Sequence, residues 1–178
     1  MTLATERLLL RMPCVDDLDG LMPIFADAEV VRFTSGITRT RAEAAARIAR
    51  WLKHWDDHGV GMLVVERPAD RRVLGRVGFL VWDAATWRHG LDADLEGVPV
   101  ETELGWTLAQ EHWGRGYATE AAIACRDWAL GERGLRRLIS LIQVGNERSK
   151  RVAAKLGMTI ESVVEREVGG PTEIWSLP

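Results

Sequence analysis

The stretch EHWGRGYATEAA, residues 111–122, places Gly114 and Gly116 at the expected start of a helix. The first N–H groups of a helix have no partner inside it and carry partial positive charge, so this end attracts anions. Glycine permits positive φ and lets a ligand approach the backbone closely. Arg115 and Thr119 add side-chain donors. The stretch therefore predicts a phosphate cradle, and the alternative is a tight strand-to-helix turn that needs glycine for its geometry alone.

Two well-known phosphate motifs do not fit this stretch. A nucleoside-triphosphate-binding loop needs a lysine followed by serine or threonine, and residues 111–122 contain no lysine. A dinucleotide-binding turn needs a third glycine, and Thr119 stands at that position. The sequence therefore disfavours nucleoside triphosphate hydrolysis and matches a dinucleotide site only weakly.

The elements that must position this turn follow from hydrophobic periodicity and from glycine and proline breaks. The pattern predicts strands at 5–12, 59–66, 73–82, 101–108 and 137–144, helices from Asp16 or Asp17 to Phe25 and at 41–57, 113–130 and 149–156, and one or two closing strands within 159–177. The second and third strands should form a hairpin, and residues 83–100 a long polar loop. A crossover helix should set strands 101–108 and 137–144 parallel or nearly so. The order indicates a mixed α/β fold in a single domain, residues 1–178.

Length, charge and cysteine content exclude several classes of protein. The chain has 178 residues and a net charge of −3, whereas a nucleic-acid-binding surface is normally basic, so no nucleic-acid partner is expected. No apolar run reaches the roughly 18 residues of a membrane span, and two cysteines make no disulfide framework, so we expect a cytoplasmic protein without a membrane partner. His54 and His58 share a helix face, but no third ligand is evident, so no metal is expected.

Three stretches in order resemble a known family. ELGWTLAQEHWGRGYATEAA, residues 103–122, is similar to the acetyl-CoA pyrophosphate signature of the Gcn5-related N-acetyltransferases (GNAT), Gln/Arg-x-x-Gly-x-Gly/Ala, with Trp113 in place of Gln/Arg. TERLLLR at residues 5–11 and NERSKRVAAKLGM at residues 146–158 resemble the opening and the late helix of the ribosomal-protein-type (RimJ/RimL-like) branch, with Met158 for an aromatic residue. The resemblance covers essentially the whole chain. It implies a mixed, mostly antiparallel sheet, flanked by helices, whose central strands splay apart to admit acetyl-CoA.

The resemblance also implies where acetyl-CoA, the expected cosubstrate, binds. Its pyrophosphate would rest on the amides of the glycine turn, and its peptide-like pantetheine arm would pair with the free edge of strand 101–108. Asn146 would bind the pantetheine or orient the late helix. The expected cofactor-binding residues are Trp106, Thr107, Leu108, Trp113, Gly114, Arg115, Gly116, Tyr117, Ala118, Thr119 and Asn146. No other cofactor is expected.

A carboxylate ahead of the glycine turn is the expected general base. An amine must lose its proton before it attacks a thioester, and burial raises the pKa of a carboxylate toward a useful value. Glu103 stands where the family often places a carboxylate, beside the apolar Leu104 and Trp106. Glu101 shares its strand face by period two and is the rival base. A backbone N–H near Trp106 or Leu108 would hold the oxyanion, and the alternative for Glu103 is a plain surface position.

The expected general acid departs from the usual family pattern. Many relatives protonate the departing thiolate with a tyrosine in the late helix, where Ala153 stands here, and Tyr117 is the one tyrosine of this chain. The branch resemblance assigns that role to the serine of the Asn-x-x-Ser element, which is Ser149. Asn146 and Ser149 are also favoured helix caps, and the two roles can coexist.

The sequence therefore predicts an N-acetyltransferase that moves an acetyl group to a primary amine in a ternary complex, with a protein N-terminal α-amine favoured. A small amine, such as a polyamine or an aminoglycoside, is the alternative acceptor, and a non-catalytic acyl-CoA-binding module is the alternative of another class. Trp82 and Trp87 would line the acceptor pocket. Five acidic residues would form a rim that attracts a cationic acceptor, unless they form only a solvated loop: Asp92, Asp94, Glu96, Glu101 and Glu103. The oligomeric state stays open, a homodimer included.

Overall fold

The computed structural model describes residues 1–91, 94–167 and 169–177, and these form one eight-stranded sheet with helices on both faces. The strands are β1 (Thr2–Ala4), β2 (Leu9–Arg11), β3 (Met62–Arg67), β4 (Arg72–Asp83), β5 (Val100–Leu108), β6 (Ile139–Gln143), β7 (Thr159–Arg166) and β8 (Gly170–Ser176). The helices are α1 (Leu18–Phe25), α2 (Ala28–Val31), α3 (Arg41–His58), α4 (Tyr117–Leu130) and α5 (Glu147–Lys155). None of the helices in these ranges is long and apolar enough to cross a membrane.

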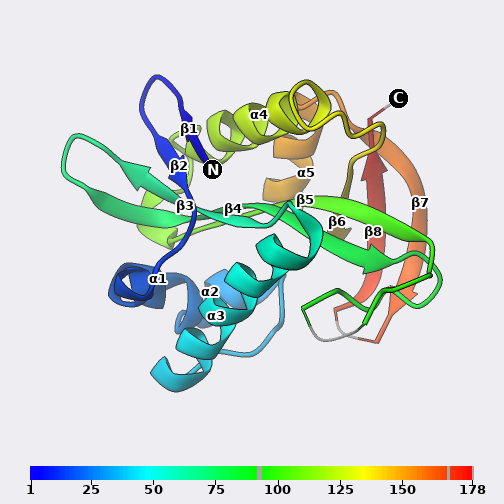
Figure 1. Ribbon diagram of the computed structural model, residues 1–178, viewed down its shortest axis with the longest axis horizontal. Coiled ribbons are helices and arrows are strands. Elements are labelled where there is room, and N and C mark those ends of the chain that lie inside the picture. Colours follow the sequence, from blue (N-terminus) through cyan, green and yellow to red (C-terminus); the bar gives the residue numbers. More distant parts are fainter. Residues whose placement is uncertain (92–93, 168, 178) are drawn as a thin grey trace.

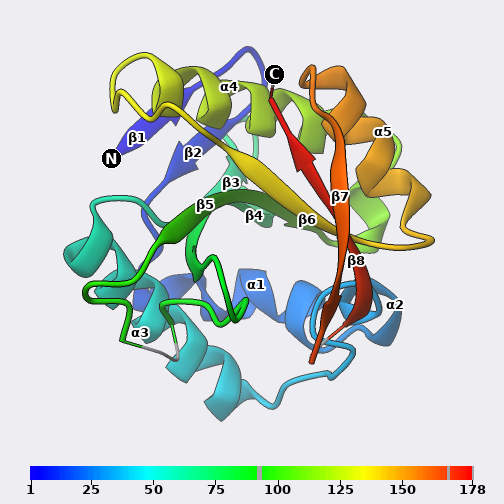
Figure 2. The same ribbon diagram turned by 90° about the vertical axis from the view of Figure 1, so that its right-hand side faces the viewer.

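The sheet is mostly antiparallel, with a parallel pair near its centre. Its strand order is β1-β2-β3-β4-β5-β6-β8-β7, and β5 runs parallel to β6 with Glu103 aligned to Ile139. This confirms the parallel pair expected for the strand–helix–strand unit. The crossover helix α4 and the later α5 lie on one face of the sheet, and α1, α2 and α3 lie on the other (Figure 1 and Figure 2).

Each face of the sheet carries its own apolar core, because side chains alternate between the faces along a strand. On one face, the small side chains of α4 pack against the sheet and are fully buried, as their spacing predicts: Ala121, Ala122, Cys125 and Ala129. On the other face, Trp51 of α3 and Phe25 of α1 pack with Met62 and Leu80 of the sheet. β5 therefore lies between two cores, and consecutive residues of β5 face different helices.

The first expected strand, residues 5–12, is wrong in its extent. The structure has two short strands, β1 and β2, with a tight turn between them. The Thr5 N–H donates to the Leu8 carbonyl over 2.9 Å, and the Leu8 N–H donates to the Thr5 hydroxyl over 3.0 Å. Threonine hydroxyls compete with strand pairing by such local bonds, so the apolar run that begins at Leu8 does not extend the strand backward.

Two helices differ from the sequence expectation. Helix α4 begins at Tyr117 rather than at residue 113, because Gly114 and Gly116 have φ angles of 74° and 82° and break the helical path. The short helix α2 is not predicted, and the side chain of Asp27 caps it. The closing segment forms two strands, as the expectation of one or two allows, and the second, β8, inserts between β6 and β7.

Candidate active site

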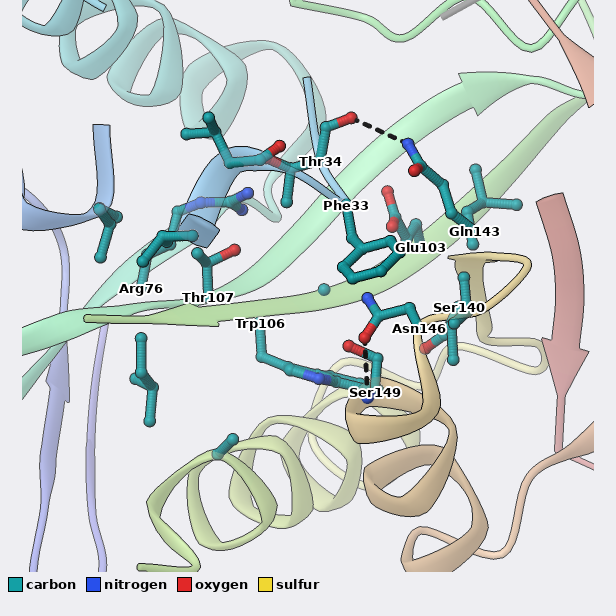
Figure 3. A pocket seen from close by; sticks show the side chains of 18 of the residues that line it. Phe33, Thr34, Arg76, Glu103, Trp106, Thr107, Ser140, Gln143, Asn146 and Ser149 are labelled. Carbon is teal, nitrogen blue, oxygen red and sulfur yellow. Dashed lines mark hydrogen bonds between the residues drawn. The ribbon is translucent and has the colours of Figure 1, made fainter. Parts of the chain in front are cut away.

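A cavity of about 730 Å³ opens between β5 and β6 beyond the aligned pair Glu103 and Ile139. Residues 103–108 of β5 and 140–143 of β6 both line it (Figure 3), and its volume suits a ligand of drug or cofactor size. The splayed centre that the resemblance implies is therefore present. Among the residues expected at the site, the following line this cavity: Glu103, Trp106, Thr107, Leu108, Trp113, Gly114, Gly116, Tyr117, Ala118, Thr119, Asn146 and Ser149.

The glycine turn forms one wall of this cavity at the start of α4. Gly116 is the N-cap of α4, and both it and Gly114 adopt the left-handed conformation that side chains disfavour. The helical hydrogen bonds begin with the Glu120 N–H, which donates to the Gly116 carbonyl over 3.0 Å. The amides of residues 117–119 precede that bond and lie at the positive end of the helix dipole. The turn can therefore bind an anion through its backbone.

The turn between β1 and β2 holds the glycine turn in place, a contact that sequence reasoning missed. Arg7 Nε donates to Glu120 over 2.7 Å, and Arg7 Nη1 donates to the Arg115 carbonyl over 3.1 Å. The Thr5 hydroxyl donates to Glu120 over 2.6 Å, and the Arg7 guanidinium lies 4.7 Å from the centroid of the Tyr117 ring. Burial acts to raise the pKa of Glu120, but the bonds from Thr5 and Arg7 hold it below its usual value. The side chain of Arg115 is exposed and lies outside the described cavity lining.

The edge of β5 offers backbone groups to the cavity. The Ala109 N–H donates to a carbonyl of β4, whereas the Leu104 carbonyl accepts from the Ser140 hydroxyl on the β6 side over 2.7 Å. Backbone groups of successive residues point to opposite sides along a strand, so the N–H and carbonyl of Trp106 point toward the gap. This edge is thus able to pair with an extended ligand or to stabilise an oxyanion.

Glu103 is partly buried in the cavity wall, on the face of β5 that carries α1 and α3. Its Oε2 accepts a hydrogen bond from the Trp82 indole N–H over 2.7 Å. Burial raises the pKa of the Glu103 carboxyl, while Arg166, the bond from Trp82 and Arg76 act in the opposite direction. The Arg166 guanidinium lies 4.4 Å from the centroid of the Trp82 ring. A carboxylate with a raised pKa beside a cavity can accept a proton at near-neutral pH.

Glu101, the rival base, is bound elsewhere. Arg137 Nε donates to its two carboxylate oxygens over 3.0 and 2.9 Å, and the same guanidinium binds Glu161. Glu101 is also outside the described lining of the cavity. The geometry therefore favours Glu103 over Glu101 as the carboxylate that can reach a ligand.

At the start of α5, different groups serve as the helix cap and as the candidate general acid. The Asn146 side chain accepts from the Ser149 backbone N–H over 3.2 Å and caps the helix (Figure 3). The hydroxyl of Ser149 plays no part in that bond, and its side chain lines the cavity. Ala153, the position at which relatives carry a tyrosine, is fully buried in the core, whereas Val152 lines the cavity.

The acidic rim expected around the acceptor does not form at this cavity. Glu103 lines it, but Asp94 and Glu96 line a separate depression beside α3, and Asp92 lies outside the described residues. Cationic side chains predominate in the described part of the lining, namely Arg39, Arg47, Arg76, Arg88, Arg148, Arg151, Lys155 and Arg166, against the carboxylates Glu29, Glu103 and Glu167. Asp94 and Glu96 of the long loop do not line this cavity, and its described lining is mostly cationic, so electrostatics does not favour a polycationic acceptor. Trp82 and Trp87, expected at the acceptor pocket, both line this cavity.

His112 is buried and lines the cavity. In the sequence, its position just before the glycine turn is the one feature that points to the site. In the described part of the chain neither ring nitrogen has a hydrogen-bond partner, and Nε2 lies 3.7 Å from the Glu111 carboxylate. Burial lowers the pKa of His112, so the ring is neutral at pH 7. Buried polar groups are nearly always paired, so a ligand in the cavity is the natural partner for this ring.

His54 and Cys125 are buried, and their contacts indicate structural roles. His54 Nδ1 lies 2.8 Å from the Val60 carbonyl, and the Val81 N–H donates to Nε2 over 3.1 Å. Nε2 must therefore accept, which puts the proton of the neutral ring on Nδ1. Within the described ranges no three His, Cys, Asp or Glu side chains gather as a metal site would require. Cys125 is fully buried, and burial raises the pKa of its thiol.

Comparison with known proteins connects this geometry to a family. Residues 7–159 match the acetyltransferase (GNAT) domain. The chain is 31% identical over 174 residues to the uncharacterized protein YkkB of Bacillus subtilis, covering 92% of this chain and 88% of that one. A crystal structure of an acetyltransferase from Agrobacterium tumefaciens superposes with a TM-score of 0.79 at 28% identity, covering 100% of this chain and 94% of the other. The ribosomal L7/L12 alpha-N-protein acetyltransferase RimL, in complex with coenzyme A, shares the fold at a TM-score of 0.77 and 13% identity, covering 99% and 97%.

Proposed function

The chain belongs to the acetyltransferase (GNAT) domain family, and from this premise we propose that it transfers the acetyl group of acetyl-CoA to a primary amine by direct attack in a ternary complex. The observation that carries this proposal is one cavity that joins the glycine turn, the open edge of β5 and the Glu103 carboxylate. A helix N-terminus suits a diphosphate, a strand edge suits a peptide-like arm, and a carboxylate suits an amine that must lose a proton.

Acetyl-CoA would extend from the glycine turn toward Glu103. Its diphosphate would lie on the amides of residues 115–119, and its pantetheine arm along the edge formed by residues 106–108. Asn146 would contact that arm from the start of α5. Arg148, Arg151 and Lys155 of α5 also line the cavity, and these cations would attract the remaining phosphate of the cosubstrate. The RimL neighbour has been solved with coenzyme A, which is consistent with this use of the shared fold.

The chemistry then needs one base, one oxyanion donor and one acid. Glu103 takes a proton from the ammonium group of the acceptor, directly or through water, and the free amine nitrogen attacks the thioester carbonyl carbon. The backbone N–H of Trp106 donates to the oxygen that becomes negative in the tetrahedral intermediate. When that intermediate collapses, the carbon–sulfur bond breaks, Ser149 donates its proton to the leaving thiolate, and the positively charged nitrogen gives a proton back to Ser149. The products are an N-acetylated amine and free coenzyme A.

The acceptor could belong to either of two classes. The resemblance to the ribosomal-protein-type branch favours a protein N-terminal α-amine, and a small amine is the alternative. Because α5 contains no tyrosine, a non-catalytic acyl-CoA-binding module is the competing hypothesis of another class. The placement of Glu103 and Ser149 beside one cavity argues against it.

A thiol-release assay with a panel of amines tests the proposal. The purified protein is mixed with acetyl-CoA and with N-terminal peptides, amino acids, polyamines and aminoglycosides, and the product is identified by its mass gain of one acetyl group. We expect amine-dependent thiol release that Glu103→Gln suppresses. Binding of acetyl-CoA without thiol release from any amine would identify a binding module instead of an enzyme.

A further inference from the structure

We propose that Arg76 and Thr107 form an anion-binding subsite in this cavity, so that the acceptor amine carries a carboxylate or a phosphate group. This inference rests on the proposed acetyl transfer and adds a substrate class to it. Both residues line the cavity and lie together in the close view of Figure 3. Neither is needed to explain binding of the diphosphate, which lies at the other wall.

The sheet places these two residues opposite each other. Arg76 of β4 and Thr107 of β5 are aligned partners in the antiparallel pair, so their Cβ atoms are about 5 Å apart on one face of the sheet. Thr107 alternates with Leu108, which packs in the core beneath α4, and therefore faces the α1 and α3 side. That is the side on which Glu103 lies, since 103 and 107 have the same parity.

Both groups lack the partners that buried polar groups normally have. The Thr107 hydroxyl is buried and has no hydrogen-bond partner in the described part of the chain. Arg76 donates to the sulfur of Met62 over 3.1 Å and lies 5.6 Å from the Trp51 ring centroid. Glu103 acts on it through its charge alone, and in the described part of the chain no hydrogen bond or ion pair joins Arg76 to a carboxylate. Guanidinium has five N–H donors, and these two contacts satisfy few of them. A partly buried guanidinium without a hydrogen-bonded carboxylate, beside an unpaired hydroxyl, is the donor set that an oxyanion requires.

The position of β5 between this pair and the proposed base has no side chain. Gly105 lies between Thr107 and Glu103, and a Cβ added there would meet the Glu103 carboxylate at 3.5 Å, which is ordinary contact. The backbone of Gly105 does not require glycine, unlike that of its partner Gly78, where a Cβ would lie 2.4 Å from the Gly61 carbonyl. Because Gly105 has no side chain, nothing from residue 105 stands between the Glu103 carboxylate and Thr107.

The spacing sets the class of acceptor. The Glu103 carboxylate leans over Gly105, which is two residues from Thr107, and two residues of a strand span about 7 Å. A molecule whose amine and anionic group are separated by that distance would place its nitrogen at Glu103 and its anion at Arg76. Arginine is well suited to this role because its planar fork binds carboxylate and phosphate through two parallel bonds.

Calorimetry on the complex with coenzyme A tests the subsite without relying on turnover. Each titration compares an amine that carries an anionic group with a matched amine in which that group is uncharged. The pairs are 5-aminopentanoate with 5-aminopentanamide, and 3-aminopropyl phosphate with 3-aminopropanol. A third pair, short peptides with Asp or Asn at the second position, tests whether the anion belongs to a polypeptide. We expect wild type to prefer the anionic member of at least one pair about tenfold or more.

Variants show which residues make that preference. Arg76→Met, which keeps the stem beside Trp51, should abolish it without weakening the binding of the amine that lacks the anion, and Arg76→Lys should retain part of it. Thr107→Val should weaken it, and Gly105→Ala should weaken binding of both members. Arg39→Met is the matched control, since it removes another cavity cation and should keep the preference.

Two kinds of result separate the outcomes. Equal affinity for both members of every pair, a preference that survives Arg76→Met, or an equal loss in Arg39→Met would each overturn the subsite. Mass spectrometry of the same amines mixed with acetyl-CoA tests the enzyme separately. A preference abolished by Arg76→Met, without any acetylated product, would support the subsite and contradict acetyl transfer.

Discussion

The Trp82 indole nitrogen lies 2.7 Å from a carboxylate oxygen of Glu103, and this bond fixes the carboxylate at the wall of the cavity. Trp82 comes from β4 and Glu103 from β5, so adjacent strands of the sheet set the orientation. The other carboxylate oxygen, Oε1, lies beside Gly105, 3.5 Å from the point where a Cβ would stand. A base held in this way needs no rearrangement before it accepts a proton.

Glu103→Gln should reduce kcat/KM for the amine by about 100-fold or more, with the affinity for acetyl-CoA unchanged. Glutamine keeps an oxygen that can accept from Trp82 but cannot take a proton. Because the amine loses its own proton as the pH rises, the defect should be greatest at low pH. Glu101→Gln is the matched control, since Glu101 is bound to Arg137 and its loss should leave the rate near that of wild type. Equal pH profiles for wild type and Glu103→Gln would remove Glu103 from the mechanism.

Gly114→Ala should weaken acetyl-CoA binding about tenfold and lower stability by about 1 kcal/mol, because the left-handed backbone disfavours a side chain and the amides of the turn must shift. Gly134→Ala is a closely matched control. Gly134 has a φ of 71° against 74° for Gly114, and at both positions an added Cβ would meet nothing within 4 Å. Gly134 lies outside the described cavity lining, so its substitution should cost similar stability without changing the calorimetric affinity. Equal losses of affinity would contradict a phosphate role for the glycine turn.

Ser149→Ala should lower kcat about tenfold or more while stability stays unchanged, because the hydroxyl acts on the thiolate and only the backbone N–H of Ser149 serves the cap. Asn146→Ala should instead cost about 1 kcal/mol of stability, since it removes the oxygen that caps α5. Denaturation curves and steady-state rates of the two variants separate the roles. Unchanged kcat in Ser149→Ala would assign protonation of the thiolate to water or to another group.

His54 should make the protein less stable as the pH falls from about 6.5 to about 4. Burial, opposed by the bond to the Val60 carbonyl, lowers its pKa from 6.5 to about 4 in the folded state. Above pH 6.5, His54 is neutral in both the folded and the unfolded protein. Between pH 6.5 and 4 it is protonated in the unfolded chain but not in the folded protein, so the free energy of unfolding decreases by up to about 3 kcal/mol. Urea denaturation at pH 7.5 and pH 4.5 should show a smaller decrease for His54→Gln than for wild type. Parallel decreases in the two proteins would exclude this contribution.

Local sequence patterns predict the parts of the fold that depend on near neighbours. The apolar face of α4, the hairpin of β3 and β4, and the glycine turn all follow from spacing within one segment, and the structure has each of them. The period-two relation of Glu101 and Glu103 was also informative, but it left two bases open. The tertiary structure decides between them, because Arg137, just before β6, binds Glu101, and Glu103 rather than Glu101 lines the cavity.

Contacts between distant segments could not be predicted in this way. Arg7 binds Glu120 across 113 positions of sequence, and nothing in either local pattern records that pair. The acidic loop gave a misleading signal for the same reason, since composition does not say which cavity a loop faces. The apolar strand pattern around Arg76 does not single it out, and its significance depends on its alignment with Thr107 on the neighbouring strand.

A crystal structure of the protein with acetyl-CoA bound tests the central claim most directly. We expect the diphosphate on the amides of residues 115–119, the pantetheine arm beside Trp106, and the thioester carbonyl between β5 and β6 within reach of an amine held at Glu103. Acetyl-CoA bound at any other surface, or with its diphosphate away from the start of α4, would contradict the claim.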